Sequence, residues 1–135
     1  MTAYLLDGTA LVEVLRAAPS PRFLRRLAGV VTSDRWTSAI VVGELMHAAR
    51  RAAEPGVMSD VLRVVSAIRV APFDLPSART YAKLAATLEW AGSALPATDL
   101  MIAATARTFE MTLVTRRPHV FTRVPQLAIE DWTLA

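Results

Sequence analysis

Short apolar runs alternate with longer helical segments along most of this chain. The runs at 3–6, 68–72, 111–115 and 126–130 have the length and composition of buried strands, and a further extended piece is expected at 35–37. The segments between them are about ten to fifteen residues long and repeat apolar residues at helical spacing. Because strands separated by helices usually pair in parallel, the pattern predicts an α/β fold, a three-layer α/β/α sandwich around a mostly parallel sheet.

Capping and breaking residues divide the helical segments. Ser20, Ser38 (or Thr37) and Thr98 each precede an apolar periodic run, so we expect them to cap helices. The expected helices span 10–17, 20–29, 38–52, 57–67, 76–90 and 96–106. Neither an internal repeat nor a linker interrupts this order, which predicts one domain over residues 1–135.

Composition limits the class of protein further. Hydrophobic residues make up 53% of the 135 positions, which is enough for a substantial core. No apolar run approaches the ~18–20 residues of a membrane-spanning helix, and the first residues lack the basic start of a signal peptide. There are no cysteines, so disulfides and thiolate metal ligands are excluded. We therefore expect a cytoplasmic protein that does not use a membrane.

The basic residues are almost all arginines. The formal net charge is +3, carried by fourteen arginines and one lysine. Arginine suits bidentate contacts with phosphate, so nucleic acid or an acidic protein is a possible partner. A GC-rich genome explains the same bias, and charge alone does not separate the two explanations.

Three carboxylates stand alone within apolar stretches, and this isolation predicts that all three are buried. Asp7 follows the first predicted strand, Glu44 lies inside the helix at 38–52, and Asp99 lies in the first turn of the helix at 96–106. Ligands of open α/β sheets bind beyond the carboxyl ends of strands, where Asp7 is expected. Helical spacing places Asp99 on the inward face of its helix, and a buried carboxylate is costly without a partner.

Two interpretations of these acids stay open. Mg²⁺ and Mn²⁺ prefer oxygen ligands, and three convergent carboxylates with such an ion would support hydrolysis of a phosphodiester. Alternatively, Asp7 is a turn former and Asp99 only complements its helix dipole. Spacing alone does not show that the three acids converge.

Four segments, in order, carry a family resemblance: YLLDGTAL, TSAIVVGEL, ATDLMIAATA and LVTRRPHVFTRVPQLAIEDW. With them the chain resembles the PIN-domain ribonucleases, and among these the VapC toxins of bacterial toxin–antitoxin pairs. The resemblance implies an α/β/α sandwich and Mg²⁺- or Mn²⁺-dependent endonuclease activity on RNA of the tRNA or rRNA class, leaving a 3′-hydroxyl and a 5′-phosphate. It also implies a cognate VapB-type antitoxin that blocks the acids, and a homodimer or a toxin–antitoxin hetero-oligomer. The apolar helices at 57–68 and 76–90 are candidate contact surfaces, although core packing explains most of their apolar positions.

The resemblance also assigns residues. Asp7, Glu44 and Asp99 match the family's acids and become the predicted metal ligands and catalytic residues. Thr9 falls where a hydroxyl or amide often lies near the metal, although its alternative role is to cap the first helix. Thr115 is expected to hydrogen-bond a water or a phosphate.

The chain departs from the family pattern after the strand at 111–115. Arg117 stands where an Asp or Asn is usual, and Val120 stands where a later acid is usual. The missing fourth ligand favours one metal ion over two. Arg116 and Arg117 either contact the RNA backbone or are solvated loop residues.

The departure also motivates an alternative function, a catalytically weak PIN-like module that binds RNA or protein. A receiver-like or nucleotide-binding domain is disfavoured, because no glycine-rich phosphate loop and no lysine after that strand are present.

Overall fold

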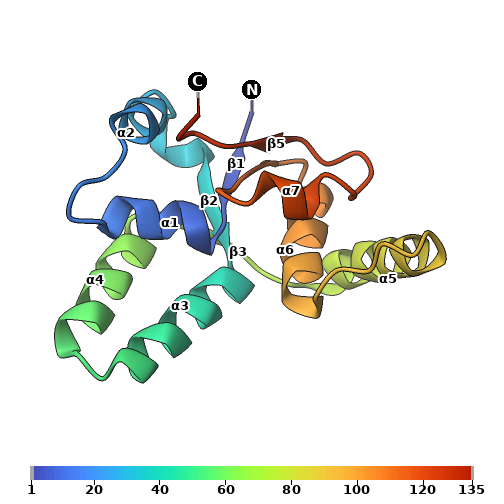
Figure 1. The fold of residues 1–135 in the computed structure, drawn as a ribbon, viewed down its shortest axis with the longest axis horizontal. Helices are drawn as coiled ribbons and strands as arrows, with labels where there is room; N and C mark the ends of the chain where they lie inside the picture. The colour runs from blue at the N-terminus through green and yellow to red at the C-terminus, as the bar shows by residue number, and fades with distance from the viewer. Residues whose placement is uncertain (1, 135) are drawn as a thin grey trace.

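Five short strands form one parallel sheet at the centre of the molecule (Figure 1). The structure, a computed structural model, describes residues 2–134. The strands are β1 (Tyr4–Leu6), β2 (Arg35–Ser38), β3 (Arg69–Ala71), β4 (Thr112–Val114) and β5 (Ile129–Glu130). Their order in the sheet is β3-β2-β1-β4-β5, and every pair of neighbours is parallel. The predicted parallel sheet is therefore confirmed.

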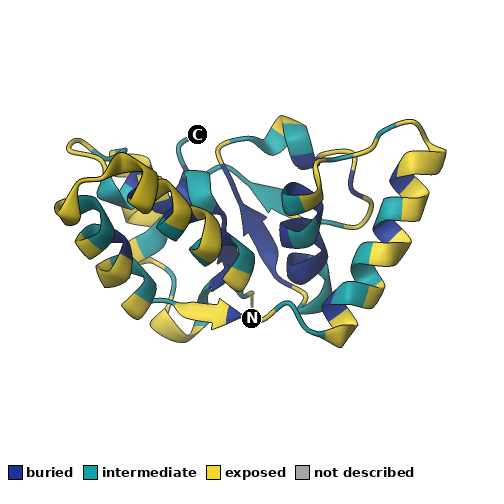
Figure 2. Ribbon diagram, turned by 90° about the horizontal axis from the view of Figure 1, so that it is seen from below, coloured by how far each residue is buried: buried dark blue, intermediate teal, exposed yellow. Residues whose placement is uncertain are grey.

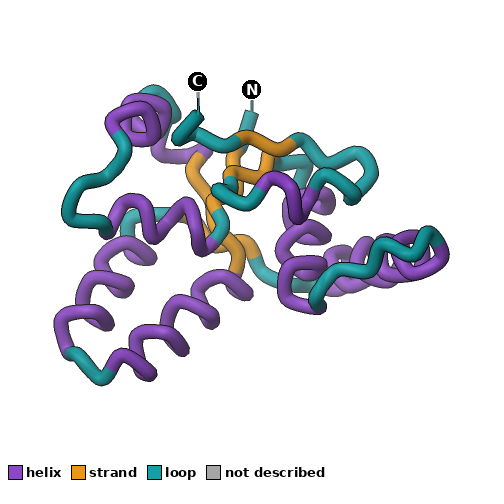
Figure 3. Tube along the Cα trace, viewed as in Figure 1, coloured by secondary structure: helices purple, strands orange, loops and turns teal. Residues whose placement is uncertain are grey.

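Helices cover both faces of this sheet. They are α1 (Gly8–Leu15), α2 (Pro21–Ala28), α3 (Ala39–Ala52), α4 (Pro55–Ser66), α5 (Leu75–Trp90), α6 (Ala97–Thr108) and α7 (Pro118–Phe121), with a 3-10 turn at Thr32–Asp34. In Figures 1 and 3, α1, α3 and α4 lie on one side of the strands, and α5 and α6 lie on the other. This arrangement confirms the predicted α/β/α sandwich.

The strand order places a crevice between β1 and β4. The chain moves outward from β1 to β2 and β3, and then returns past them to pair β4 with the other edge of β1. Such a reversal sends the helical connections to opposite faces and opens a ligand crevice at the carboxyl ends of the two strands. Leu6 is in register with Val114, so Asp7 and Thr115 follow their strands at the same edge of the sheet.

The core lies along the two central strands and α6. Leu5, Leu6, Leu113 and Val114 are almost completely buried. Figure 2 shows the buried strands running between helices whose outer faces are exposed. Across residues 2–134, no helix has the length and apolarity needed to cross a membrane.

Two of the three predicted helix caps are confirmed. The Ser20 hydroxyl accepts from the Phe23 N–H at 3.3 Å, and the Ser38 hydroxyl accepts from the Val41 N–H at 3.0 Å, as predicted. The prediction that Thr98 caps α6 is wrong. That helix begins at Ala97 after Pro96, whose fixed φ favours helix entry without a side-chain cap.

Candidate functional site

The side chain of Asp7 joins the end of β1 to the start of α1. Its Oδ1 accepts hydrogen bonds from the Thr9 hydroxyl at 2.6 Å and from the Ala10 N–H at 3.0 Å, so Asp7 is the N-cap of α1. Its Oδ2 is buried and has no hydrogen-bond partner among the described residues, although the residue is only 2% exposed. An unpaired buried carboxylate oxygen is costly, and it is therefore a strong candidate to bind a ligand.

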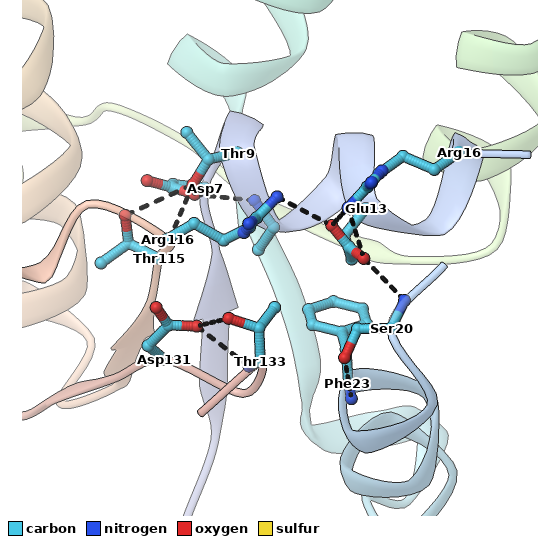
Figure 4. Close-up of polar contacts among 11 residues, drawn as sticks. Asp7, Thr9, Glu13, Arg16, Ser20, Phe23, Thr115, Arg116, Asp131 and Thr133 are labelled. Carbon is cyan, nitrogen blue, oxygen red and sulfur yellow. Dashed lines mark hydrogen bonds and ion pairs between the residues drawn. The ribbon is translucent and has the colours of Figure 1, made fainter. Parts of the chain in front are cut away.

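Thr9 links α1 to the loop after β4 (Figure 4). Its hydroxyl donates to Asp7, accepts from the Arg116 N–H at 2.9 Å, and lies 3.4 Å from the Thr115 hydroxyl. The expectation that Thr9 caps the first helix is wrong, because Asp7 takes that role. Thr9 instead holds the Asp7 carboxylate in place and brings the two strand ends together.

Thr115 is completely buried at the end of β4. Its hydroxyl accepts from the Arg117 N–H at 3.0 Å and so shapes the turn that follows the strand. The predicted contact of Thr115 with a water or a phosphate stays a prediction. The structure shows Thr115 fixing the direction in which Arg117 leaves the sheet.

Asp99 and Arg117 form an ion pair across the site. Asp99 is buried in the first turn of α6, and its Oδ1 accepts from Nη2 of Arg117 at 2.8 Å. The hydrogen bond to Asp99 raises the pKa of Arg117, and the charges of Asp99, Asp7 and Glu44 act in the same direction. Neither role considered for Arg117, a backbone contact with RNA or a solvated loop side chain, includes this pairing with an acid of the site.

Glu44 lies at the rim of the site rather than inside the protein. The expectation that it is buried is wrong, because α3 directs Val41, Leu45 and Ala49 into the core and leaves Glu44 exposed. Partial desolvation raises the pKa of Glu44, the negative charges of Asp99 and Asp7 raise it further, and Arg117 opposes them. The three carboxylates are therefore close enough to influence one another's charge.

These side chains surround one cavity of about 500 Å³. Its walls are formed by Asp7, Gly8, Thr9, Val12, Glu44, Leu45, Ile102, Arg116 and Arg117. The fold thus brings most of the predicted site residues to a single concave surface. Asp99 is not part of the cavity wall, but it forms an ion pair with Arg117, which is. Oxygen donors of this kind suit a hard divalent cation. In the described part of the chain, however, no three Asp, Glu or His side chains form a preassembled metal cage.

Glu13 is a charged residue of this region that the sequence did not single out. It is 1% exposed, and its carboxylate accepts from the Ser20 N–H at 2.7 Å, from Arg16 at 3.1 Å and from Arg116 at 3.0 Å (Figure 4). The Ser20 N–H is the main cause of its lowered pKa, and the two arginines add to it. The available signal was its position between Val12 and Val14 in an apolar helix. Glu13 ties the Arg116 guanidinium to α1 at the edge of the cavity.

Comparisons with known proteins agree with this arrangement. The family model described as PIN domain matches residues 4–126. The toxin FitB of Neisseria gonorrhoeae is 28% identical over 135 residues, covering 95% of this chain and 97% of that protein. The tRNA(fMet)-specific endonuclease VapC of Salmonella typhimurium is 26% identical over 133 residues, covering 98% and 99%. A crystal structure of DNA-bound VapBC from Salmonella typhimurium matches with a TM-score of 0.89 at 26% identity, again covering 98% and 99%.

Proposed function

Because this chain belongs to the PIN-domain family, we propose that it is an endoribonuclease toxin of a toxin–antitoxin pair. It would cleave RNA phosphodiester bonds with a bound Mg²⁺ or Mn²⁺, and a cognate VapB-type antitoxin would hold it inactive. The observation that carries the proposal is the buried Oδ2 of Asp7, which has no hydrogen-bond partner within residues 2–134 and belongs to a residue that lines the cavity together with Glu44.

The orphaned Oδ2 of Asp7 supports a divalent cation at this site, and we expect Asp7, Asp99 and Glu44 to be its ligands once the ion draws them together. When bound, such an ion would activate a water and offset the negative charge of the scissile phosphate. Thr9 and the Ala10 N–H fix the Asp7 carboxylate, so its free oxygen is held in one direction. Glu44 is exposed and has a raised pKa, which suits it to take a proton from a water in the cavity.

We expect Arg116 and Arg117 to bind the RNA backbone. The side chains of Arg116 and Arg117 line the cavity and are 43% and 40% exposed. Each is also held by an acid, Arg116 by Glu13 and Arg117 by Asp99. A guanidinium has five N–H donors, so each arginine keeps donors for a phosphate while paired.

We expect the surface formed by α3 and α4 to bind a partner. Solved structures of relatives include VapBC and FitAB, and this supports a protein partner for this chain as well. A second cavity lies between α3 and α4, lined by Met46, Ala49, Arg50, Ala53, Glu54, Pro55, Met58 and Leu62. Its apolar lining supports the prediction that the helix at 57–68 contacts an antitoxin or a second copy of the chain.

The test uses protein purified free of antitoxin and incubated with cellular RNA. We expect cleavage with Mg²⁺ or Mn²⁺ and none with EDTA, and sequencing of the RNA ends would identify the target. Asp7→Asn and Asp99→Asn should each reduce the rate by about 100-fold or more, because each removes a charged ligand. Asp60→Asn is the matched control, since Asp60 pairs with Arg63 on α4, outside the cavity. Cleavage that persists in both site variants would refute the metal site.

One observation favours the second candidate function. Asp99 is already paired with Arg117, and the usual fourth acid is missing. A catalytically weak module that binds RNA would have this appearance. It predicts that the antitoxin-free protein retains RNA with either metal but does not shorten it, a result that the same assay distinguishes from cleavage.

A further inference from the structure

Arg117 is held at two points by the structure around it. Its backbone N–H donates to the Thr115 hydroxyl at 3.0 Å, and its side chain donates to Oδ1 of Asp99 at 2.8 Å. The guanidinium also lies 5.8 Å from the centre of the Phe121 ring. The side chain is therefore fixed beside the acids rather than extended into solvent.

The charge at the site is balanced for a single divalent ion. Asp7, Glu44 and Asp99 carry three negative charges when ionised, and Arg117 supplies one positive charge, which leaves a net charge of about −2. Arg116 is directed to Glu13 instead. No Asp or Glu lies between Thr115 and Glu130, so the end of β4 adds only positive charge to this edge of the sheet.

The carboxylate oxygens of the two buried acids, Asp7 and Asp99, differ in their hydrogen bonds. Oδ1 of Asp99 is bonded to Arg117, and Oδ1 of Asp7 is bonded to Thr9 and Ala10. Oδ2 of Asp7 is buried without a partner among the described residues. An incoming ion would therefore meet an available ligand at Asp7, and it would have to share Asp99 with the guanidinium.

We propose that the Arg117 guanidinium takes the place of a second metal ion at this site. It neutralises the charge of Asp99 and so limits the site to one divalent ion. The inference rests on the proposed metal-dependent function and names the residue that sets its metal stoichiometry. In the absence of metal the same guanidinium offsets the repulsion among the three acids.

The experiment is a calorimetric titration of the full, antitoxin-free chain with Mn²⁺. The wild type should bind one Mn²⁺ per chain. Arg117→Asn should bind Mn²⁺ at least about tenfold more tightly or take up a second ion, because a charge this close changes an ionic equilibrium by about one to three powers of ten. Arg117→Lys keeps the charge and should stay near the wild type, whereas a role in hydrogen-bond geometry alone would make it resemble Arg117→Asn.

Arg123→Asn is the matched control for net charge. Arg123 lies in the same part of the chain, but its guanidinium donates to the Ala94 carbonyl at 3.4 Å and forms no ion pair with an acid within residues 2–134. The affinity of this variant for Mn²⁺ should change by less than about twofold, because an exposed charge that is not paired with a site acid is screened by solvent and salt.

A second readout is independent of activity. With EDTA, Arg117→Asn should melt at a lower temperature than the wild type, and Mn²⁺ should raise its Tm by more. Two Mn²⁺ per wild-type chain, or an Arg117→Asn variant with unchanged affinity and Tm, would overturn the inference while leaving the proposed function standing. If neither protein binds Mn²⁺, both the metal-dependent function and this inference fail.

Discussion

Single residues of the site each serve more than one role. Asp7 caps α1 through one carboxylate oxygen, and its other oxygen is buried with no hydrogen-bond partner in the described part of the chain. Arg117 pairs with Asp99 and remains 40% exposed. Because the cap and the pair fix these side chains, the cavity is organised before any ligand arrives, which lowers the free energy needed to order it on binding.

Glu44→Gln should slightly stabilise the metal-free protein at neutral pH. Folding raises the pKa of Glu44, so the stability it contributes is present below its ordinary value of 4.5 and is lost as the pH rises through the folded value. Glutamine cannot ionise and avoids that loss. Because Glu44 is exposed, we expect a gain below about 1 kcal/mol.

The measurement for Glu44→Gln is urea denaturation with EDTA, at pH 7 and at pH 4. The advantage of the variant should shrink toward pH 4, where Glu44 in the folded wild type is protonated. A variant less stable than the wild type at pH 7 would show that the Glu44 charge is favourable in the fold, contrary to its environment.

Among the elements, α6 fixes the position of Asp99, which lies in its first turn. Nearly every residue from Asp99 to Ala106 is buried, because α6 packs between the sheet and α5. The alanines on this helix allow close approach to its neighbours on several sides. A helix buried all round cannot shift without disturbing the core, so the position of Asp99 is fixed by packing as well as by Arg117.

Ala103→Leu should destabilise the protein by about 1–3 kcal/mol, because Ala103 is 0% exposed and a larger side chain forces its neighbours apart. It should also reduce RNA cleavage by displacing Asp99. Ala86→Leu on the exposed face of α5 is the control, expected within about 0.5 kcal/mol of the wild type. Denaturant unfolding of both variants checks the prediction, and equal midpoints would contradict the packing of α6.

At the scale of the whole molecule, the strand order creates the site. β1 and β4 are neighbours in the sheet although most of the chain separates them in sequence. Their pairing brings Asp7 and Thr9, which follow β1, against Thr115 and Arg116, which follow β4. The site therefore depends on the central strands and their long-range pairing rather than on any local motif.

Leu113→Ala tests this dependence. Leu113 lies in β4 and is 0% exposed, so its loss should cost about 2–5 kcal/mol through the cavity left behind. Leu134→Ala is the control, because Leu134 is 64% exposed and should change stability by less than about 0.5 kcal/mol. Thermal unfolding compares the two, and a similar Tm for both would contradict the central place of β4.

Local sequence signals predict the layers of this protein and most of its helix ends. The spacing of apolar residues and the length of each run distinguish strands from helices, and Ser20 and Ser38 mark helix starts. These signals act between residues close in the chain, so the sequence alone contains them. The isolation of Asp7 and Asp99 in apolar stretches also marked them as unusual, and both are buried.

Which distant residues meet depends instead on tertiary packing. Local periodicity assigns a residue to a face of its own element, but it does not say which other element covers that face. For this reason the sequence does not predict that Glu44 is exposed, that Glu13 is buried and paired with Arg116, or that Arg117 pairs with Asp99. Each of these features depends on how distant helices and loops pack together, since long-range packing and not local spacing sets the surroundings of a charge.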